Sequence, residues 1–352
     1  MYPRLLINLK KFEHNAKTLL TLCKNNNITL AAVTKVFGGD PKLVRILCNL
    51  EVDFLADSRL KNIAKYPKKR PETILLRLPS LYEAKKTAAN CDISCNSEIS
   101  TINALGKAAA ELNINHGIIL MIDLGDLREG IYHRKRRVIF QTAEAVLAHK
   151  NLTLKGVGAN LTCYGSVLPT TDNMEILCKI AKGIENRFKI KLSISGGNSS
   201  SLYMLEDLPR AVNNLRLGEA IIRGVETAYG RVFPGLKEDV VILEADIIEL
   251  MKKPSMPEGE LGMNAFGEHP VYEDKGIQTR AILAIGRQDI DQNDMISQTP
   301  HAEIIGSSSD HTIVDVTKVR PALEVGDTLR FSLTYGGILS AFTSEYVYRK
   351  YV

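Results

Sequence analysis

The sequence predicts an α/β protein in which a (β/α)8 TIM barrel is followed by a C-terminal, mostly antiparallel β domain. Two observations carry this prediction. Short apolar runs alternate with helical patterns over the first two thirds of the chain, and after about residue 226 the pattern changes to closely spaced β-branched runs. We therefore expect a barrel over residues 9–226 and a β domain over residues 227–352, completed by an N-terminal strand at residues 1–8. A chain of 352 residues is long enough for two such domains.

Eight apolar or β-branched runs form the strands of the predicted barrel. In chain order they are 29–36, 52–57, 73–78, 92–96, 117–124, 154–161, 191–195 and 213–217. Eight strands that alternate with helices indicate a closed parallel barrel. A doubly wound open sheet is the alternative, but such sheets usually have fewer strands, and no GxGxxG motif follows the first run.

The helical patterns between these runs are amphipathic. Residues 9–23 and residues 172–188 each place their apolar side chains on one stripe. Another helix is predicted to begin at Pro41, because Asp40 is a favourable N-cap and proline is favoured at the first helical position. The basic run "HRKRRV" (133–138) opens a further helical pattern, and we interpret it as a solvated helix face rather than a phosphate-binding patch.

The segment after residue 226 has the texture of an antiparallel β domain. Its runs "VVILEADIIEL", "TRAILAIG", "HAEIIGSSSDHTIVDVT" and "DTLRFSLTYGGI" are short and β-branched, and Gly, Pro, Asp and Asn separate them. The chain shows no internal repeats, low-complexity segments or heptads.

The composition is that of a globular protein, with 45% hydrophobic and 24% charged residues. The net charge of +5 is small for this length, and the lysines are dispersed, so nucleic acid is not an expected partner. No stretch approaches a membrane helix, and the N-terminus lacks the features of a signal peptide. Cys91 and Cys95 have no second pair and no nearby histidine, so we expect no zinc or other metal site. Scattered cysteines favour a reduced, cytoplasmic location.

The polar residues that follow the predicted strands are the candidates for an active site, because in this barrel the site lies at the C-terminal ends of the strands. Seven of the eight runs end in, or are followed by, polar side chains. These are Lys35, Arg77, Asn96, Asp123 with Arg128, Asn160 with Thr162 and Cys163, the turn "SGGNSSS" (195–201), and Arg216 followed by Gly218. A single polar strand end is unremarkable, but together these residues line one mouth.

Lys35 and the turn at 195–201 point to a cofactor. A lysine at the end of a buried strand is costly unless its charge is neutralised, and the turn offers N–H groups and hydroxyls that would hold a phosphate. A Schiff base between Lys35 and a phosphorylated aldehyde satisfies both features, and pyridoxal 5'-phosphate is that cofactor. The alternatives are a lysine whose stem packs while its ammonium reaches solvent, and an ordinary capped turn.

Arg216 stands where the pyridine ring would present its nitrogen. An arginine does not donate a proton at working pH, so that nitrogen would stay unprotonated and the ring would be a weaker electron sink. Such a ring suits rapid removal and return of one proton. The alternative is a surface arginine at a strand end, and a comparable alternative applies to Arg77, the other cationic candidate for the cofactor site.

On these residues, and on the motifs "LINLKKFEHNAKTLL" near the N-terminus and "GSSSDHTIVDV" in the β domain, the chain resembles the alanine racemase-like, fold-type III pyridoxal-phosphate enzymes. It is most similar to their alanine/ornithine racemase branch. The resemblance covers nearly the whole chain, and its motifs occur in the order that the family has them.

The resemblance implies a role for each matching residue. Lys35 in "VTKV" would hold the cofactor and act as one catalytic base. Arg128 in "DLGDLREG" would approach the cofactor hydroxyl and the substrate carboxylate, Asn160 would lie against the ring, and Arg216 would bond the pyridine nitrogen. Phosphate contacts would come from the turn (Asn198, with Ser199 or Ser200), from Gly218 and Glu219, and from Tyr335.

The second acid/base departs from the family pattern. Arg287 in "AIGRQDID" stands where the alanine racemases have a catalytic tyrosine contributed by the partner subunit, and Gly39 stands where they have another tyrosine. Cys163, Asp289 and Asp310 are the remaining candidates, Asp310 because it matches an aspartate near the partner's active site. Cys163 has the better intrinsic chemistry, because a thiol can titrate near neutrality; its alternative is a small buried hydrophobic residue.

The sequence thus predicts a pyridoxal-phosphate-dependent amino-acid racemase that removes the α-proton on one face and returns a proton on the other. The resemblance favours ornithine or lysine, and an aspartate such as Asp289 or Asp310 would pair with the distal ammonium. The alternatives are an alanine or serine racemase, a decarboxylase or aldolase on the same scaffold, and a non-catalytic carrier of the cofactor. The β domain implies a head-to-tail homodimer.

Overall fold

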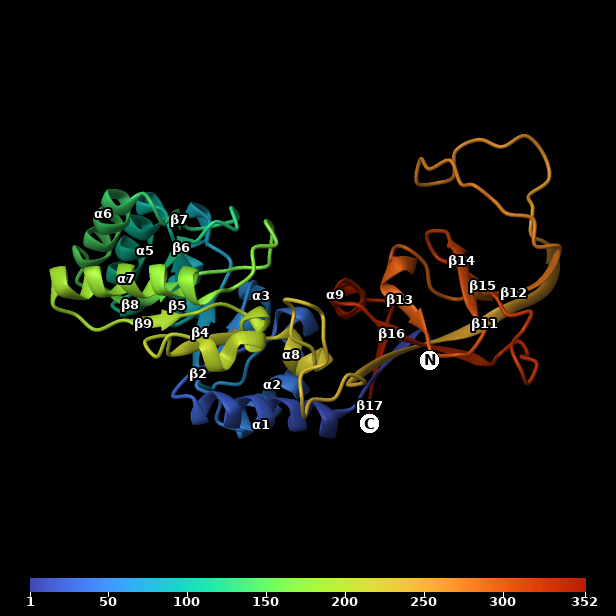
Figure 1. Cartoon of the computed structure of the whole chain (residues 1–352), viewed down its shortest axis with the longest axis horizontal. Coiled ribbons are helices and arrows are strands. Elements are labelled where there is room, and N and C mark those ends of the chain that lie inside the picture. Colours follow the sequence, from blue (N-terminus) through green and yellow to red (C-terminus); the bar gives the residue numbers. More distant parts are fainter. The chain divides into compact units, whose positions relative to one another are not determined.

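The structure, a computed structural model, describes residues 1–352 and divides them into two compact units. The barrel unit comprises Lys10–Glu238, and the β unit comprises Met1–Leu9 together with Asp239–Val352. Figure 1 shows that both chain termini lie in the β unit, where β1 (Arg4–Ile7) pairs in parallel with β17 (Tyr348–Tyr351).

The barrel unit is built on a closed ring of eight parallel strands. Its ring order is β2-β3-β4-β5-β6-β8-β9-β10, and both the pairing of β5 with β6 and that of β10 with β2 are present. The strands are β2 (Thr29–Val33), β3 (Phe54–Asp57), β4 (Glu72–Leu75), β5 (Ile93–Asn96), β6 (His116–Asp123), β8 (Leu152–Gly158), β9 (Ser193–Ser195) and β10 (Asn214–Leu217). Each predicted run therefore overlaps a strand, and closure of the ring excludes the doubly wound alternative. The short β7 (Ile131–Tyr132) pairs with β6 outside the ring.

Helices follow the strands around the ring. They are α1 (Leu9–Asn25), η1 (Lys35–Phe37), α2 (Pro41–Asn49), α3 (Leu60–Ile63), η2 (Leu81–Glu83), α4 (Ala84–Asn90), α5 (Ile99–Glu111), α6 (Arg136–Leu147), α7 (Thr171–Phe188), η3 (Ser199–Asp207) and α8 (Glu219–Arg223). Figure 1 shows α5, α6 and α7 gathered on one side of the barrel unit. Their apolar stripes form one continuous core with the outer faces of β6, β8 and β9.

Two sequence features explain the local structure around the first barrel strand. Asp40 is the N-cap of α2, because its Oδ1 accepts the N–H groups of Lys42 at 3.0 Å and Leu43 at 3.2 Å, with Pro41 in the first turn. Gly39 has φ of +63°, and a Cβ there would lie 3.0 Å from the carbonyl oxygen of Asn62. A tyrosine at this position would meet strain and a close backbone contact.

Small and apolar side chains fill the interior of the barrel. Ala31, Val33, Ala56, Ile74, Ile93, Cys95, Ile119 and Met121 form this inner cluster. Because side chains alternate along a strand, the residues next to these on each strand face the surrounding helices instead. The filled interior leaves the strand ends as the place where polar side chains can meet.

The β unit is an antiparallel sheet with the order β13-β16-β11-β12-β15-β14, extended by β1 and β17 at β11. Its elements are β11 (Val241–Pro254), β12 (Ile277–Leu283), η4 (Gln292–Asp294), β13 (Met295–Ser297), β14 (Glu303–Ser307), β15 (Thr312–Asp315), β16 (Thr328–Leu333) and α9 (Tyr335–Thr343). The N-terminal strand was expected here, and β1 indeed pairs with β11, Leu5 opposite Leu243.

The two units divide at Glu238, whereas the change in sequence texture was placed at residue 226. The intervening residues 227–238 are tied to α1. The Asn15 side chain donates to the carbonyl oxygen of Lys237 and accepts the Lys237 N–H, both at 2.8 Å, and His14 Nε2 bonds the Gly235 carbonyl oxygen at 2.8 Å. These bonds hold an irregular segment on the barrel unit, which periodicity does not reveal.

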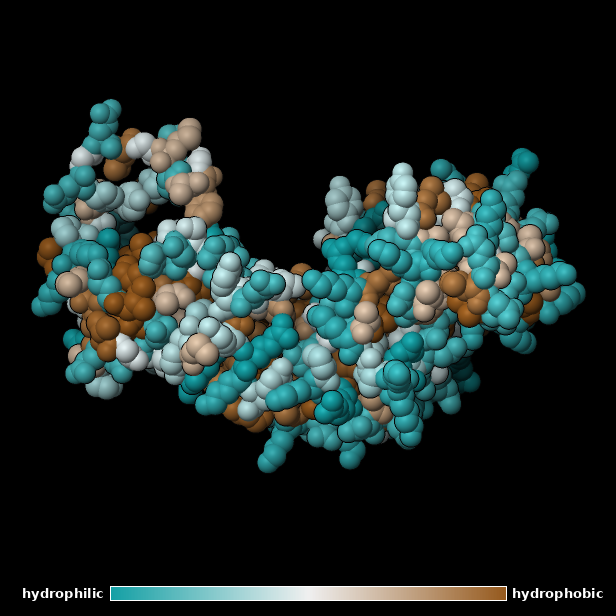
Figure 2. Space-filling model, turned by 180° about the vertical axis from the view of Figure 1, so that it is seen from behind, coloured by the Kyte–Doolittle hydropathy of each residue, from teal (hydrophilic) through white to brown (hydrophobic).

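Large apolar side chains are exposed on the β unit. Ile248 and Met251 on β11 and Ile277 on β12 are 45%, 54% and 62% exposed, and Figure 2 shows apolar side chains of this kind in brown among the polar ones. No helix in either unit combines the length and the apolar character that a membrane span needs.

Candidate active site

Arg216 lies at the centre of the polar residues of the barrel mouth. It is the third residue of β10 and is only 3% exposed, so the surface-arginine alternative is wrong. Its guanidinium donates to the carbonyl oxygen of Ala159 at 2.5 Å, to Asn160 Oδ1 at 2.8 Å and to Ser195 Oγ. Burial lowers the pKa of Arg216, yet a guanidinium stays charged in proteins. The network therefore fixes a positive charge at the strand ends.

Asn160 joins Arg216 to the loop after β6. Its Oδ1 accepts from Arg216 while its Nδ2 donates to Glu129 Oε1. Glu129 in turn accepts from both Nε and Nη2 of Arg128, the latter at 2.6 Å. Arg128, Asn160 and Arg216, which the sequence placed in one mouth, are thus joined through a glutamate that the sequence reasoning did not select.

The turn after β9 supplies a group of small polar side chains. Asn198 Oδ1 accepts the N–H of Ser200 at 2.8 Å, and Asn198 Nδ2 donates to the Leu161 carbonyl oxygen at 3.0 Å. Ser199 Oγ accepts the N–H of Ala220 at 3.2 Å. Ser200 Oγ is fully buried and has no hydrogen-bond partner. A buried hydroxyl without a partner is costly, and a ligand oxygen would satisfy it.

Gly218 and Glu219 follow β10 beside this turn. A Cβ on Gly218 would lie 2.9 Å from Val33 Cβ, so only glycine fits between the ends of β10 and β2. The Glu219 side chain forms an ion pair with Arg223, one turn later in α8. Burial raises the pKa of Glu219, and the charges of Arg223 and Lys35 oppose that rise. Lys35 is therefore electrostatically close to Glu219.

Lys35 is partly buried at the start of η1, directly after β2. The charges of Arg128 and Lys35 also act on Cys163, so both cations lie near this thiol. Cys163 is exposed, so the alternative of a small buried hydrophobic residue is wrong, yet partial desolvation by the surrounding loops raises its pKa above the ordinary value. Desolvation thus outweighs the two cations, and the raised pKa does not favour the thiolate of Cys163. Cys163 Sγ contacts the Leu161 carbonyl oxygen at 3.3 Å and Asn198 Nδ2 at 3.5 Å.

Arg77 differs from the sequence expectation. The strand predicted over 73–78 ends at Leu75, so Arg77 lies in the following loop with 44% of its side chain exposed. Its Nη2 pairs with Glu83 Oε2 at 2.9 Å, and the same glutamate belongs to the capping box at Ser80. The structure therefore does not bring Arg77 into the network around Arg216.

The other four predicted residues, Arg287, Asp289, Asp310 and Tyr335, belong to the β unit. Arg287 pairs with Glu268 at 3.1 Å and lies 4.2 Å over the ring of Phe266. Asp289 is 5% exposed and accepts from Ser344 Oγ, whereas Asp310 is exposed and accepts from Ser309 Oγ at 2.6 Å. That bond lowers the pKa of Asp310.

Tyr335 is the first residue of α9. Thr334 caps this helix by accepting the Gly337 N–H at 3.3 Å. Within the β unit these contacts give Tyr335 a fixed place at a helix start.

Asp126 is a second residue of the mouth that the sequence reasoning missed. It is 1% exposed, and its carboxylate accepts the N–H groups of Cys163, Tyr164 and Val167 at 3.3, 2.9 and 3.2 Å. The loop after β6 is therefore fastened to the loop after β8. The sequence shows an aspartate inside the loop "DLGDLREG", but it reveals neither the burial of this side chain nor the backbone N–H groups that it binds.

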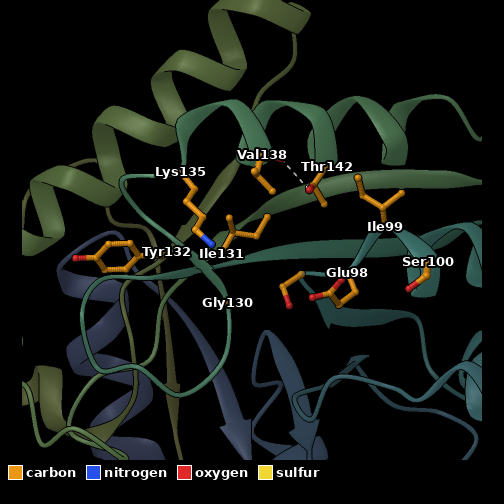
Figure 3. Close-up of a pocket in the computed structure, with 10 residues that line it drawn as sticks. Glu98, Ile99, Ser100, Gly130, Ile131, Tyr132, Lys135, Val138 and Thr142 are labelled. Atoms are coloured by element: carbon orange, nitrogen blue, oxygen red, sulfur yellow. Dashed lines mark hydrogen bonds between the residues drawn. The ribbon is translucent and has the colours of Figure 1, made fainter.

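A cavity of about 450 Å³ opens beside this region of the barrel unit. Figure 3 shows Glu98, Ile99 and Ser100 from the start of α5 on one side, and Tyr132 and Lys135 on the other. None of the predicted site residues lines this cavity, so it is separate from the network around Arg216.

The residues of the mouth fit pyridoxal phosphate. The unpartnered hydroxyl of Ser200 offers a donor for a phosphate oxygen, and Arg216 offers a buried cation that does not give up its proton. A barrel with a lysine after its first strand, a turn of small polar residues after the seventh and an antiparallel β unit defines a recognisable class of protein.

Comparison with known proteins identifies the family. The sequence pattern described as "Alanine racemase, N-terminal domain" matches residues 7–224, so the chain belongs to the alanine racemase family. It is 44% identical over 350 residues to an ornithine racemase of Acetoanaerobium sticklandii, covering 99% of both chains. It is 36% identical over 356 residues to a lysine racemase of Thermotoga maritima, covering 100% of this chain and 99% of the relative.

The fold comparison agrees. An alanine racemase from Bartonella henselae, solved with covalently bound pyridoxal phosphate, matches with a TM-score of 0.76 and 17% identity over 100% of both chains. The expected combination of a TIM barrel and an antiparallel β domain is therefore confirmed, and so is the resemblance to this family.

Proposed function

We propose that this protein is an amino-acid racemase that uses pyridoxal 5'-phosphate and interconverts the enantiomers of ornithine or lysine. The observation that carries the proposal is the 44% identity with an ornithine racemase over 99% of both chains. The lysine racemase relative at 36% identity supports the same class of substrate, an amino acid with a distal ammonium.

The residues of the mouth would hold the cofactor and the amino acid. Lys35 would carry the cofactor, the turn with Asn198, Ser199 and Ser200 would bind its phosphate together with Gly218 and Glu219, and Arg216 would face the ring nitrogen. Bound pyridoxal phosphate acidifies the α-hydrogen of an amino acid. Arg128 would bind the substrate carboxylate, and Asn160 would lie against the ring.

Two groups would move the proton. Lys35 Nζ would take or give a proton on one face of the α-carbon, and a second group would serve the opposite face, because one rigid side chain cannot reach both. Cys163 is the candidate within the barrel unit. Its raised pKa keeps the thiol protonated near neutral pH, which suits the donation of a proton.

The β unit would contribute through a second copy of the chain. Arg287, Asp289 and Asp310 lie in this unit, and the resemblance places the positions of Arg287 and Asp310 at the partner's active site. We therefore include a head-to-tail homodimer in the proposal, in which the partner's β unit completes the site and Tyr335 approaches the phosphate. Light scattering on the purified protein tests it, and a monomer with full activity would refute it.

A panel of L-amino acids tests the activity. L-Ornithine, L-lysine, L-alanine and L-serine are each incubated with the protein and pyridoxal phosphate, and the D-enantiomer is measured by chiral chromatography alongside CO2 release. We expect D-ornithine or D-lysine to form fastest and CO2 to stay at background. Release of CO2 would indicate a decarboxylase. Bound cofactor with no product from any amino acid would indicate a carrier.

A further inference from the structure

Glu129 is the carboxylate that joins the cationic residues of the barrel mouth. Its side chain is 17% exposed, although it lies in a loop after β6. Three hydrogen bonds converge on it, two from Arg128 and one from Asn160. A glutamate held by three donors at a strand end is not a solvated surface residue.

The loop that carries Glu129 has a defined conformation. Asp123 Oδ1 accepts the N–H groups of Gly125 at 2.8 Å and Leu127 at 3.1 Å, and Leu127 has φ of +57°. A Cβ on Gly130 would lie 2.7 Å from the backbone nitrogen of Asp123, so the loop closes against its own strand. Together with the bonds of Asp126, these contacts hold Glu129 facing the mouth rather than solvent.

The charges around Glu129 explain why a carboxylate is needed there. Arg216, Arg128 and Lys35 bring three positive charges to one mouth, and Glu129 is electrostatically close to Arg216 and Cys163. Without it, Arg128 would lose its two bonds to Glu129 and would be repelled by the buried Arg216. An arginine that is held bidentately keeps one orientation of its planar fork.

We propose that Glu129 is a positioning residue of the racemase site, which fixes the guanidinium of Arg128 for the carboxylate of the amino acid and the amide of Asn160 for Arg216. This inference rests on the proposed function, because it assumes that Arg128 binds the substrate carboxylate. Glutamine at position 129 cannot replace the carboxylate, since its amide nitrogen donates and would face the donors of Arg128 or Asn160.

Two stable probes test the inference without turnover. Pyridoxamine 5'-phosphate carries the ring and phosphate but no carboxylate, whereas N-(5-phosphopyridoxyl)-L-ornithine carries both. Their affinities for the cofactor-free protein are measured by calorimetry. We expect Glu129→Gln to weaken the phosphopyridoxyl-ornithine complex by about 10- to 100-fold, and the pyridoxamine phosphate complex by no more than about twofold.

A double-mutant cycle shows whether Glu129 acts through Arg128. In an Arg128→Gln background, Glu129→Gln should change the affinity for phosphopyridoxyl-ornithine by no more than about twofold. Glu129→Asp keeps the charge but is one methylene shorter, and should fall between wild type and Glu129→Gln. Glu175→Gln is the matched control, because Glu175 forms an exposed ion pair with Lys179 on α7, at 3.0 Å.

The outcomes are distinct. Equal weakening of both probes by Glu129→Gln, or additive effects of the two substitutions, would overturn the positioning role while leaving the racemase proposal intact. A wild-type protein that bound neither probe would refute the proposed function, and the inference would fall with it. Should Glu129→Gln not fold, the Glu129→Asp protein decides by the same ratio of affinities.

Discussion

The neighbouring serines 200 and 201 should respond in opposite directions to the loss of their hydroxyls. Both are fully buried in η3. Ser200 Oγ has no hydrogen-bond partner, whereas Ser201 Oγ donates to the Gly196 carbonyl oxygen at 2.7 Å. An unpaired buried hydroxyl costs about 1–3 kcal/mol, and a made hydrogen bond contributes about 1 kcal/mol. In the cofactor-free protein, Ser200→Ala should therefore stabilise and Ser201→Ala should destabilise, each by about 1 kcal/mol.

Thermal unfolding followed by circular dichroism measures this difference. A change of 1 kcal/mol corresponds to a shift of about 2 °C in Tm for a folding unit of the size of the barrel unit, Lys10–Glu238, so the two variants should differ by about 4 °C. Ser201→Ala is the matched control, because it removes the same atom from the next residue. Equal losses of Tm in the two variants would show that the Ser200 hydroxyl has a partner in the free protein.

The same pair separates stability from binding. If the Ser200 hydroxyl donates to the phosphate, its bond to a charged group contributes about 1.5–3 kcal/mol, so Ser200→Ala should weaken pyridoxamine phosphate binding by about 10- to 100-fold. Ser201→Ala should stay within about twofold of wild type. Calorimetric titration of the cofactor-free proteins measures both. An unchanged affinity for Ser200→Ala would refute the assignment of this hydroxyl to the phosphate.

Three further substitutions probe other parts of the barrel unit. Burial lowers the pKa of His116 from 6.5 to about 4. Between these two pH values the unfolded chain binds more protons than the folded protein, so the free energy of unfolding falls by up to about 3 kcal/mol as the pH drops from about 6.5 to 4. His116→Gln should flatten that fall in urea denaturation at stepped pH, and an unchanged slope would contradict it. Asp126→Asn leaves one side-chain oxygen for three N–H groups and should destabilise the protein by about 1–3 kcal/mol. Hydrogen exchange at the Tyr164 amide should become faster. Protection of this amide from exchange equal to that in the wild type would refute the claim that Asp126 fastens the two loops. Cys163→Ala should lower racemisation by at least about 100-fold with unchanged pyridoxamine phosphate affinity, and a loss below about threefold would assign the second acid/base to the β unit.

The fold could be read from the sequence because its signals are local. Every barrel strand lies in or overlaps a short apolar run, and the start of α2 follows from Asp40 and Pro41 alone. The end of a barrel strand fixes the position of the residues that lie at it or directly follow it. Lys35, Asn160 and Arg216 could therefore be placed in one mouth from the sequence. The position of Arg77 was predicted wrongly because it depends on a loop. Its strand ends at Leu75, before the predicted residue 78, and the Arg77 side chain is partly exposed.

The partners of the site residues could not be read in the same way. A glutamate next to an arginine in a loop is usually a solvated pair, and the sequence does not reveal that Glu129 also accepts a hydrogen bond from Asn160. The pKa of Cys163 likewise depends on groups that lie far from it in the sequence. Its sequence neighbours do not reveal that desolvation outweighs the charges of Arg128 and Lys35. The partners of Glu129 and the pKa of Cys163 both depend on long-range packing, which the spacing of residues in the sequence does not reveal.

The most direct test of the central claim is the fate of L-ornithine in D2O. The protein loaded with pyridoxal phosphate is incubated with L-ornithine, and the products are separated by chiral chromatography and analysed by mass spectrometry. We predict D-ornithine that carries one solvent deuterium at its α-carbon, and no such product from Lys35→Ala. Unchanged L-ornithine, or a product that has lost its carboxylate, would contradict the claim.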